Sequence, residues 1–516
     1  MSDAVVIIGG GLGGLSAAIR LSAAGLRVKL FEKNSTPGGK MGELRREGYR
    51  FDTGPSLLTM PAVLDDLFSS AGENLTDHLS LEIPEPLTRY HFDDGSVLNA
   101  SADEGRMQAE IARLMPGEIE NYRRFLEYSK RIYEITSDIF LHRPVHELSS
   151  MLSYDLLKSL VKLPAIDPLR SMHDAIAGFF EDPRLIQLFD RYATYTGSDP
   201  YQAPATLNII PYVEFGLGGF YISGGMYRLV EVLHELALAN GAEIYTNRPV
   251  ESILHNRSEV TGVRVNGEDI TADTVLCNAD AVFAANQLIS GLPGWTERMN
   301  EKEPSLSGMV FLWGVNDTHP ELAHHNIFFS GDYAEESRRI FREHSVPEDP
   351  TVYAAITSKS DPDHAPPGKE NWFVLLNMPY LSPGQDWDHA VSAMRGAVLK
   401  KLGKHGVHLA GKIESETIMT PEDFAGRYGA NRGGIYGIAS NGPMAAFNRS
   451  PNRSRVLDGL YFAGGTAHPG GGIPLVLLSG MMAADLIAKR AGGSAANSGI
   501  QNTNIMKTSI HDRITE

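Results

Sequence analysis

Three glycines near the N-terminus have the spacing of a phosphate-binding turn. Gly9, Gly11 and Gly14 follow the apolar stretch 5–8 and precede helical apolar spacing from Leu15 to Ala24. The first glycine allows a tight bend, the second lets the backbone approach a pyrophosphate, and the third lets helix and strand pack closely. The amino end of the helix then faces the phosphates. This pattern predicts a dinucleotide-binding turn.

An acidic residue lies where a ribose is recognised in such a site. Glu32 directly follows the next predicted strand, Val28 to Phe31. A carboxylate there accepts hydrogen bonds from ribose hydroxyls and disfavours a 2′-phosphate, so NADP is not expected. A glycine-rich turn without a ligand is the alternative. The dinucleotide site is favoured because the strand, the helix, the second strand and the acid all fall at the expected places.

A second glycine-rich segment lies near the C-terminus. Leu460 to Ala463 is predicted to be a strand, and Gly464 and Gly465 let its end approach a ring or a phosphate without a Cβ clash. The apolar run from Ile473 is predicted to be a helix that starts after the turn 469–472. Its amino end offers amides and positive potential to a bound cofactor. A glycine-rich cap before an ordinary core helix is the alternative.

The composition limits the class of protein. The 516-residue chain has a net charge of −17, which argues against nucleic-acid binding, and its length suits two or three domains. The single Cys277 excludes an internal disulfide framework and a cysteine-rich zinc site, and no metal is expected. Neither an export signal nor about 18 consecutive apolar residues is present. We therefore expect a cytoplasmic protein, either soluble or held at a membrane surface.

The remaining chain predicts a helical region and a second sheet. Residues 60–200 show mainly helical patterning, whereas 307–316 and 371–380 are typical of strands in a mostly antiparallel sheet. The glycine pair 224–225 is predicted to cap a helix from Met226 to about Ala239. Strands after that helix are expected to return to the nucleotide domain.

One amphipathic segment allows two interpretations. Its apolar residues fall on one face of a predicted helix, with lysines at 158 and 162 away from the centre of that face. These apolar residues are Leu152, Leu156, Leu157, Leu160 and Val161. Packing on the body of the protein is the usual role of such a helix. Contact with a membrane interface is the alternative.

The residues after Glu32 resemble a known motif. Gly38-Gly39-Lys40, followed by the stretch from Phe51 to Ser56, is similar to the extended dinucleotide-binding motif of amine-oxidase-like flavoproteins. This resemblance implies FAD as the cofactor. Lys40 stands where many relatives carry arginine, and lysine lacks the planar bidentate fork.

The C-terminal segment GGTAHPGGGIP, with its apolar helix, resembles that of bacterial-type phytoene desaturases and related carotenoid desaturases. GGFYISGGM, HHNIFFSGDY and TPEDFAGRYGANRGGIYG extend the resemblance over nearly all of residues 4–490. HHNIFFSGDY is more similar to the dehydrosqualene-desaturase and hydroxycarotenoid 3,4-desaturase branches. The implied fold is α/β: a Rossmann-type FAD-binding domain interleaved with an α+β substrate domain and a helical membrane-facing region.

This two-domain flavoprotein fold implies domain ranges and FAD-binding residues. The FAD-binding domain is expected over residues 1–60, 205–285 and 450–490, the substrate domain over 61–204 and 286–449, and a disordered tail over 491–516. The implied FAD-binding residues are Gly9, Gly11, Gly13, Gly14, Glu32, Lys33, Gly39, Lys40, Gly54, Pro55, Ser56, Val250, Gly464, Gly465, Gly472, Ile473 and Pro474. The backbone of Val250 corresponds to the position that meets the adenine, and an ordinary strand residue is the alternative.

The implied activity is an FAD-dependent oxidation of CH–CH groups. It would introduce conjugated double bonds into a C40 or C30 carotenoid precursor. A quinone or oxygen is the implied electron acceptor, and the inner membrane surface is the implied location. A carotene cis–trans isomerase, an amine oxidase and a flavin-less prenyl-protein escort-like binder are the alternatives.

No catalytic residue follows from the sequence alone. His468 is a candidate base, but a histidine in a His-Pro turn more often fixes a loop by hydrogen bonds. Asp190 and Arg191 are candidates for chemistry in the substrate domain. We favour a buried structural pair for these two residues, because buried charges require partners.

Overall fold

A five-stranded parallel sheet holds the two glycine-rich segments together. The computed structural model describes residues 4–137, 146, 163–442 and 448–492. The strand order is β10-β2-β1-β14-β20. The strands are β1 (Ala4–Ile8), β2 (Arg27–Phe31), β10 (Glu243–Tyr245), β14 (Val275–Cys277) and β20 (Leu460–Phe462). They come from all three ranges predicted for the FAD-binding domain, although the boundaries themselves stay a prediction.

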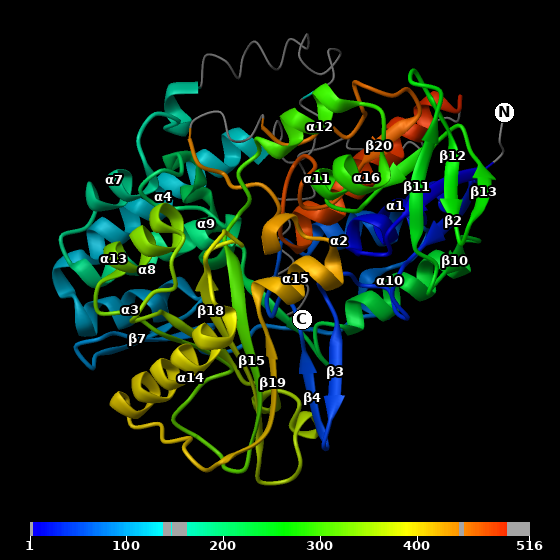
Figure 1. Ribbon diagram of the computed structural model, residues 1–516. Coiled ribbons are helices and arrows are strands. Elements are labelled where there is room, and N and C mark those ends of the chain that lie inside the picture. Colours follow the sequence, from blue (N-terminus) through cyan, green and yellow to red (C-terminus); the bar gives the residue numbers. More distant parts are fainter. Residues whose placement is uncertain (1–3, 138–145, 147–162, 443–447, 493–516) are drawn as a thin grey trace.

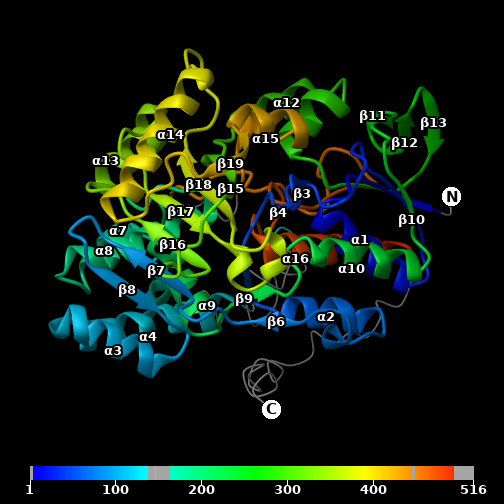
Figure 2. The same cartoon turned by 90° about the horizontal axis from the view of Figure 1, so that it is seen from below.

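Two helices from opposite ends of the chain pack beside this sheet. Helix α1 (Leu12–Ala23) and helix α16 (Ile473–Arg490) lie side by side, in blue and red in Figure 1. They meet so closely that a Cβ on Gly480 would lie 2.1 Å from the Gly13 carbonyl oxygen. Ser16 Oγ donates to the Leu477 carbonyl (3.0 Å), which joins the helices again. Helix α10 (Arg228–Ala239) lies beside α1, as Figure 2 shows.

The predicted second sheet is present and mostly antiparallel. Its strand order is β19-β15-β18-β17-β16-β7-β8, and only β16 and β7 pair in parallel within it. The strands are β7 (Thr88–His91), β8 (Val97–Ala100), β15 (Ser307–Val315), β16 (His325–Phe328), β17 (Val352–Ala355), β18 (Glu370–Met378) and β19 (Ile413–Met419). Strands β7 and β8 fall in the range predicted to be mainly helical. Both strands are only four residues long and carry no clear strand pattern, so the pairing of β7 with β16 and of β8 with β7 decides their conformation.

Helices cover this second part of the molecule, which occupies the left and lower half of Figure 1. They are α3 (Glu104–Leu114), α4 (Ile119–Thr136), α7 (Met172–Ala177), α8 (Pro183–Asp190), α9 (Ile209–Phe215), α13 (Tyr333–Arg338), α14 (Trp387–Lys404) and α15 (Pro421–Tyr428). One buried cluster joins β7 and β8 to α3, α4 and α8 through residues such as Tyr90, Phe125 and Phe189. A second cluster packs α14 on β15 and β18.

Smaller elements complete the fold. The first group is β3 (Glu43–Arg46), β4 (Tyr49–Asp52), β5 (Leu58–Thr59), α2 (Ala62–Ser70), β6 (Leu81–Glu82) and β9 (Gly219–Ile222). The second is β11 (Val250–His255), β12 (Val260–Val265), β13 (Glu268–Thr271), α11 (Ala281–Phe283) and α12 (Pro293–Asn300). The predicted amphipathic helix around 152–161 and nearly all of the predicted tail lie outside the described residues. None of the helices that the structure describes is long and apolar enough to cross a membrane.

Candidate functional site

A cavity of about 1480 Å³ runs between the two sheets. Every predicted FAD-binding residue except Gly14 lines it, and so do His468 and Arg191. Much of the remaining wall is apolar and includes Leu57, Ile209, Ile210, Val213, Phe373 and Leu375. One continuous space therefore joins the glycine-rich segments to an apolar wall. Contact of these residues with FAD stays a prediction.

The N-terminal turn has the predicted glycine chemistry. Gly9 has φ +92°, a conformation that L side chains rarely adopt. A Cβ on Gly14 would lie 2.1 Å from the Gly9 carbonyl oxygen, so Gly14 serves close packing and lies behind the cavity wall. Helix α1 begins at Leu12, one turn before the predicted start at Leu15, which brings its amino end to the cavity.

Hydrogen bonds hold the Glu32 carboxylate at the end of β2. Its Oε2 accepts from the Gly10 amide (2.7 Å), and its Oε1 accepts from the amide of Asn34 (2.8 Å). The side chain is buried and still lines the cavity. Val250 lies at the start of β11 and lines the same cavity. The predicted ribose and adenine positions therefore belong to one region of the wall.

Asn278 joins the two glycine-rich segments and was not predicted from the sequence. Its Nδ2 donates to the Gly9 carbonyl (3.2 Å), whereas a Cβ on Gly464 would lie 2.9 Å from its Oδ1. Oδ1 is shielded from solvent and has no hydrogen-bond partner among the described residues. The available signal was the position of an asparagine directly after the buried strand β14, at the carboxyl end of a parallel sheet.

Gly472 leaves the amino end of α16 open to the cavity. It is the N-cap of the helix with φ +101°, and a Cβ there would meet nothing within 4 Å. His468, four residues earlier, is buried and fixed through its backbone. Its amide donates to the Ser450 carbonyl (3.0 Å), and its carbonyl accepts from Asn452 Nδ2 (2.9 Å). These bonds support the loop-fixing interpretation of His468, which stays a prediction.

Lys40 holds a loop against the cavity. Its Nζ donates to the carbonyls of Gly434 (2.9 Å) and Ile435 (3.0 Å). Burial lowers the pKa of Lys40 to about 8, and the nearby Asp280 carboxylate opposes this shift. Lys40 lines the cavity, so its predicted contact with the pyrophosphate would have to coexist with these two bonds.

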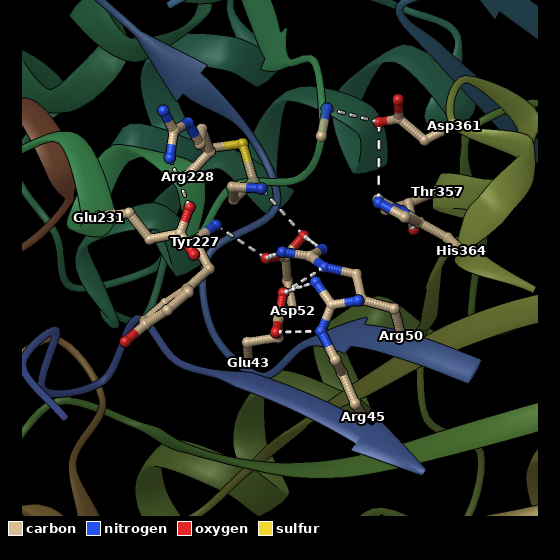
Figure 3. Close-up of polar contacts among 12 residues, drawn as sticks. Glu43, Arg45, Arg50, Asp52, Tyr227, Arg228, Glu231, Thr357, Asp361 and His364 are labelled. Atoms are coloured by element: carbon tan, nitrogen blue, oxygen red, sulfur yellow. Dashed lines mark hydrogen bonds and ion pairs between the residues drawn. The ribbon is translucent and has the colours of Figure 1, made fainter. Parts of the chain in front are cut away.

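A buried ion pair positions the cavity-lining loop 53–56. Asp52, the last residue of β4, accepts from Arg50 Nη1 (2.6 Å) and from the Met226 and Tyr227 amides (3.0 and 2.9 Å). Figure 3 shows Arg50 between Glu43 and Asp52, with Tyr227 beside Asp52. A Cβ on Gly225 would lie 2.1 Å from Arg50 Nη1, which explains the glycine before α10.

The predicted pair of Asp190 and Arg191 is wrong. Both residues are buried, but Asp190 accepts from His173 Nδ1 (2.8 Å) and lies away from the cavity wall. Arg191 lines the cavity, and its Nη2 donates to Tyr90 Oη (3.0 Å). The helical backbone continues from α8 into a 3-10 turn over Arg191–Thr196. Adjacent residues of a helix do not face each other, so the two neighbours find separate partners.

These features fit FAD. Gly9 and Gly464 both have a positive φ that L side chains rarely adopt, and a Cβ on Gly464 would lie 2.9 Å from Asn278 Oδ1. The buried Glu32 carboxylate lies at the end of β2, and Asn278 Oδ1 has an unused acceptor among the described residues. The amino ends of α1 and α16 both face the cavity, where they attract negative charge. A dinucleotide with a redox-active ring matches this set of groups.

Comparison with known proteins agrees with this assignment. The family model of flavin-containing amine oxidoreductases matches residues 12–488. A 1-hydroxycarotenoid 3,4-desaturase from Flavobacterium sp. (strain P99-3) is 39% identical over 93% of this chain and 98% of its own. A 4,4'-diapolycopene oxygenase from Methylomonas sp is 37% identical, over 94% of this chain and 97% of its own.

Solved structures show the same fold. Cyclohexylamine oxidase from Brevibacterium oxydans superposes with a TM-score of 0.61 at 17% identity, over 95% of this chain and 99% of that one. An oxidoreductase from Methanosarcina mazei gives a TM-score of 0.61 at 18% identity, over 93% and 99%. The two-domain flavoprotein fold and FAD as the cofactor are thus confirmed. The chain belongs to the flavin-containing amine oxidoreductase family, among its carotenoid desaturase-type, FAD-dependent oxidoreductases.

Proposed function

We propose that the protein is a desaturase that introduces conjugated double bonds into a C40 or C30 carotenoid precursor. The observation that carries this proposal is the single cavity that joins the glycine-rich segments to an apolar wall. The names of similar proteins, a carotenoid desaturase and carotenoid oxygenases, support the substrate class. These names favour a carotenoid substrate over an amine or a prenyl-protein ligand.

The apolar wall selects the substrate by length and shape. Each buried methylene contributes about 0.8 kcal/mol, so a long hydrocarbon gains affinity only in a deep cavity. Side chains such as Ile209, Val213 and Phe373 supply that surface and exclude water from the reacting carbons. When bound, FAD would accept the hydride equivalent from one C–H bond, and the adjacent carbon would lose a proton as the new double bond forms.

A quinone or oxygen then receives the electrons, and the protein works at the inner membrane surface on its cytoplasmic side. The support is chemical, because a carotenoid precursor and a quinone both dissolve in the bilayer and scarcely in water. Described residues on either side of the segment 138–162 line the cavity wall, among them Thr136 and Ile166. Substrate would enter from this side.

Oxygenation of a carotenoid is the second candidate. It is favoured by relatives named 4,4'-diapolycopene oxygenase and 4,4'-diaponeurosporene oxygenase, which are 37% and 35% identical. Such a reaction needs molecular oxygen as a co-substrate, whereas desaturation with a quinone does not. The two candidates can therefore be separated by the presence of oxygen.

The test is an anaerobic incubation of the FAD-loaded protein with a quinone and liposomes that carry phytoene, dehydrosqualene or a 1-hydroxycarotenoid. A desaturase gives red-shifted polyene bands and consumes quinone in proportion, and flavin-free protein gives neither. A change in cis–trans geometry without quinone consumption would instead show an isomerase. Product that forms only in air and carries a new oxygen would show the oxygenase.

A further inference from the structure

A buried cationic group interrupts the cavity wall on the substrate side. Arg191 is 8% exposed and lines the cavity from the turn that follows α8. Its guanidinium lies over the rings of Tyr192 (4.7 Å) and Tyr195 (5.3 Å), and its Nη2 donates to Tyr90 Oη (3.0 Å). Cation–π contacts and this one bond therefore hold the guanidinium in place.

One donor of this group is unused. Arg191 Nε is shielded from solvent, and no described residue accepts a hydrogen bond from it. A buried donor without an acceptor is destabilising, and a hydrocarbon cannot relieve that cost. By contrast, Arg449, another buried cation of the wall, donates to the Gly465 carbonyl (2.8 Å) and to Ser440 Oγ (3.0 Å). Arg191 is thus the better candidate for contact with a ligand oxygen.

The charge around Arg191 favours a neutral oxygen. Glu214 is 1% exposed and accepts from Tyr192 Oη (2.8 Å) and Tyr195 Oη (2.6 Å). Its carboxylate also interacts electrostatically with Arg191, so the buried cation already has a compensating anion nearby. A carboxylate ligand would add a second negative charge to this cluster, whereas a hydroxyl or carbonyl adds only an acceptor.

We propose that Arg191 is a specificity-determining residue that binds a hydroxyl or carbonyl oxygen at one end of the substrate. The enzyme would then prefer an oxygenated carotenoid over the hydrocarbon with the same skeleton. A site built to donate to a ligand oxygen discriminates strongly against the analogue that lacks it, because the buried donor is left unpaired. This proposal rests on the proposed function and specifies its substrate class.

The test compares two ligands on the FAD-loaded full chain: lycopene and 1-hydroxy-1,2-dihydrolycopene in the same detergent. Binding is followed by quenching of protein fluorescence, and flavin absorbance reports FAD content. The wild type should bind the hydroxylated polyene at least about tenfold more tightly, which corresponds to about 1.4 kcal/mol. Arg191→Met should lose this preference through weaker binding of the hydroxylated polyene, with lycopene affinity within about twofold.

Two further variants separate recognition from folding. Arg191→Lys keeps the charge but lacks Nε, so it should fold with FAD and still lose the preference. Tyr192→Phe removes one bond to Glu214 without changing the cavity lining, so the affinity ratio of the two ligands should stay at the wild-type value. A ratio that falls in Tyr192→Phe but not in Arg191→Lys would overturn the proposal.

Other outcomes also decide the question. Equal affinity of the wild type for both polyenes, or an equal loss for both in Arg191→Met, would overturn the role of Arg191 alone. If neither polyene binds while FAD stays bound, both the proposed function and the inference about Arg191 fail. If lycopene or phytoene is bound and desaturated without any preference for oxygen, the proposed function stands and only the inference fails.

Discussion

The two ends of the cavity are built in different ways. At the nucleotide end, the backbone packs so closely that only glycine fits, since a Cβ on Gly13, Gly14 or Gly480 would lie 2.1 to 2.6 Å from a neighbouring atom. At the substrate end, the wall depends on side chains that satisfy one another, as Arg191 and Glu214 do through shared tyrosines. Substitutions that add a side chain should disrupt the nucleotide end, and substitutions that remove polar groups should disrupt the substrate end.

The largest effect is expected at Gly14. Gly14→Ala places a methyl group 2.1 Å from the Gly9 carbonyl oxygen, so the turn must move and FAD should be lost during gel filtration. Flavin absorbance per protein measures this loss. Gly396→Ala is the control, because this glycine lies in α14 with open space around it, where alanine favours a helix. A full complement of flavin in Gly14→Ala would contradict the description of this end.

Asp52 tests the junction between the two ends. Asp52→Asn keeps an acceptor but removes the charge opposite the buried Arg50, which should destabilise the fold by about 3 kcal/mol. Urea unfolding measures this change, and weaker FAD binding should accompany it because loop 53–56 follows directly. Asp269→Asn breaks an exposed pair with Arg264 and should unfold like the wild type. Equal stability of both variants would show that the Asp52 network does not hold the loop.

The difference between the two ends of the cavity also explains which features could be predicted from the sequence. The glycine turn, Glu32 and the start of α16 depend on neighbours along the chain, so their spacing was sufficient. Asn278 and the Arg191 cluster depend on residues far apart along the chain: Gly9 and Asn278 are separated by 269 residues, and Tyr90 and Arg191 by 101. The predicted pairing of Asp190 with Arg191 failed for this reason. Residue type showed that each charge needs a partner, but not which partner the fold supplies.

A buried histidine beside the substrate end should make stability depend on pH. Burial lowers the pKa of His324 to about 4, and its Nδ1 hydrogen-bonds with Ser360 Oγ (2.7 Å). Below pH 6.5 the unfolded chain binds a proton that the folded protein excludes, so stability falls as pH drops from 6.5 towards 4. His324→Gln removes the group that binds this proton. The decrease in the free energy of unfolding between pH 7 and 5 should therefore be smaller by about 2 kcal/mol.

Urea unfolding at the two pH values measures that difference. The exposed His389 is the control, since His389→Gln should keep the wild-type dependence on pH. An unchanged dependence in His324→Gln would show that this ring is protonated in the folded protein or is reached by water.

The smallest effect is expected at Lys40, which lies at the nucleotide end of the cavity. Burial lowers the pKa of Lys40 to about 8, so it is charged below pH 8 and neutral above it in the FAD-free protein. A contact with the pyrophosphate requires the charged form, so above pH 8 FAD binding must take up a proton and its affinity should fall by up to about tenfold per pH unit. Titration of FAD-free protein with FAD at pH 7 and 9 measures this fall.

Lys40→Met should bind FAD more weakly at pH 7 and lose the dependence of FAD affinity on pH, whereas Lys33→Met should keep that dependence. If Lys40→Met keeps the dependence, Lys40 serves only its two carbonyl partners, and its bonds are purely structural, in contrast to those proposed for Arg191 at the substrate end.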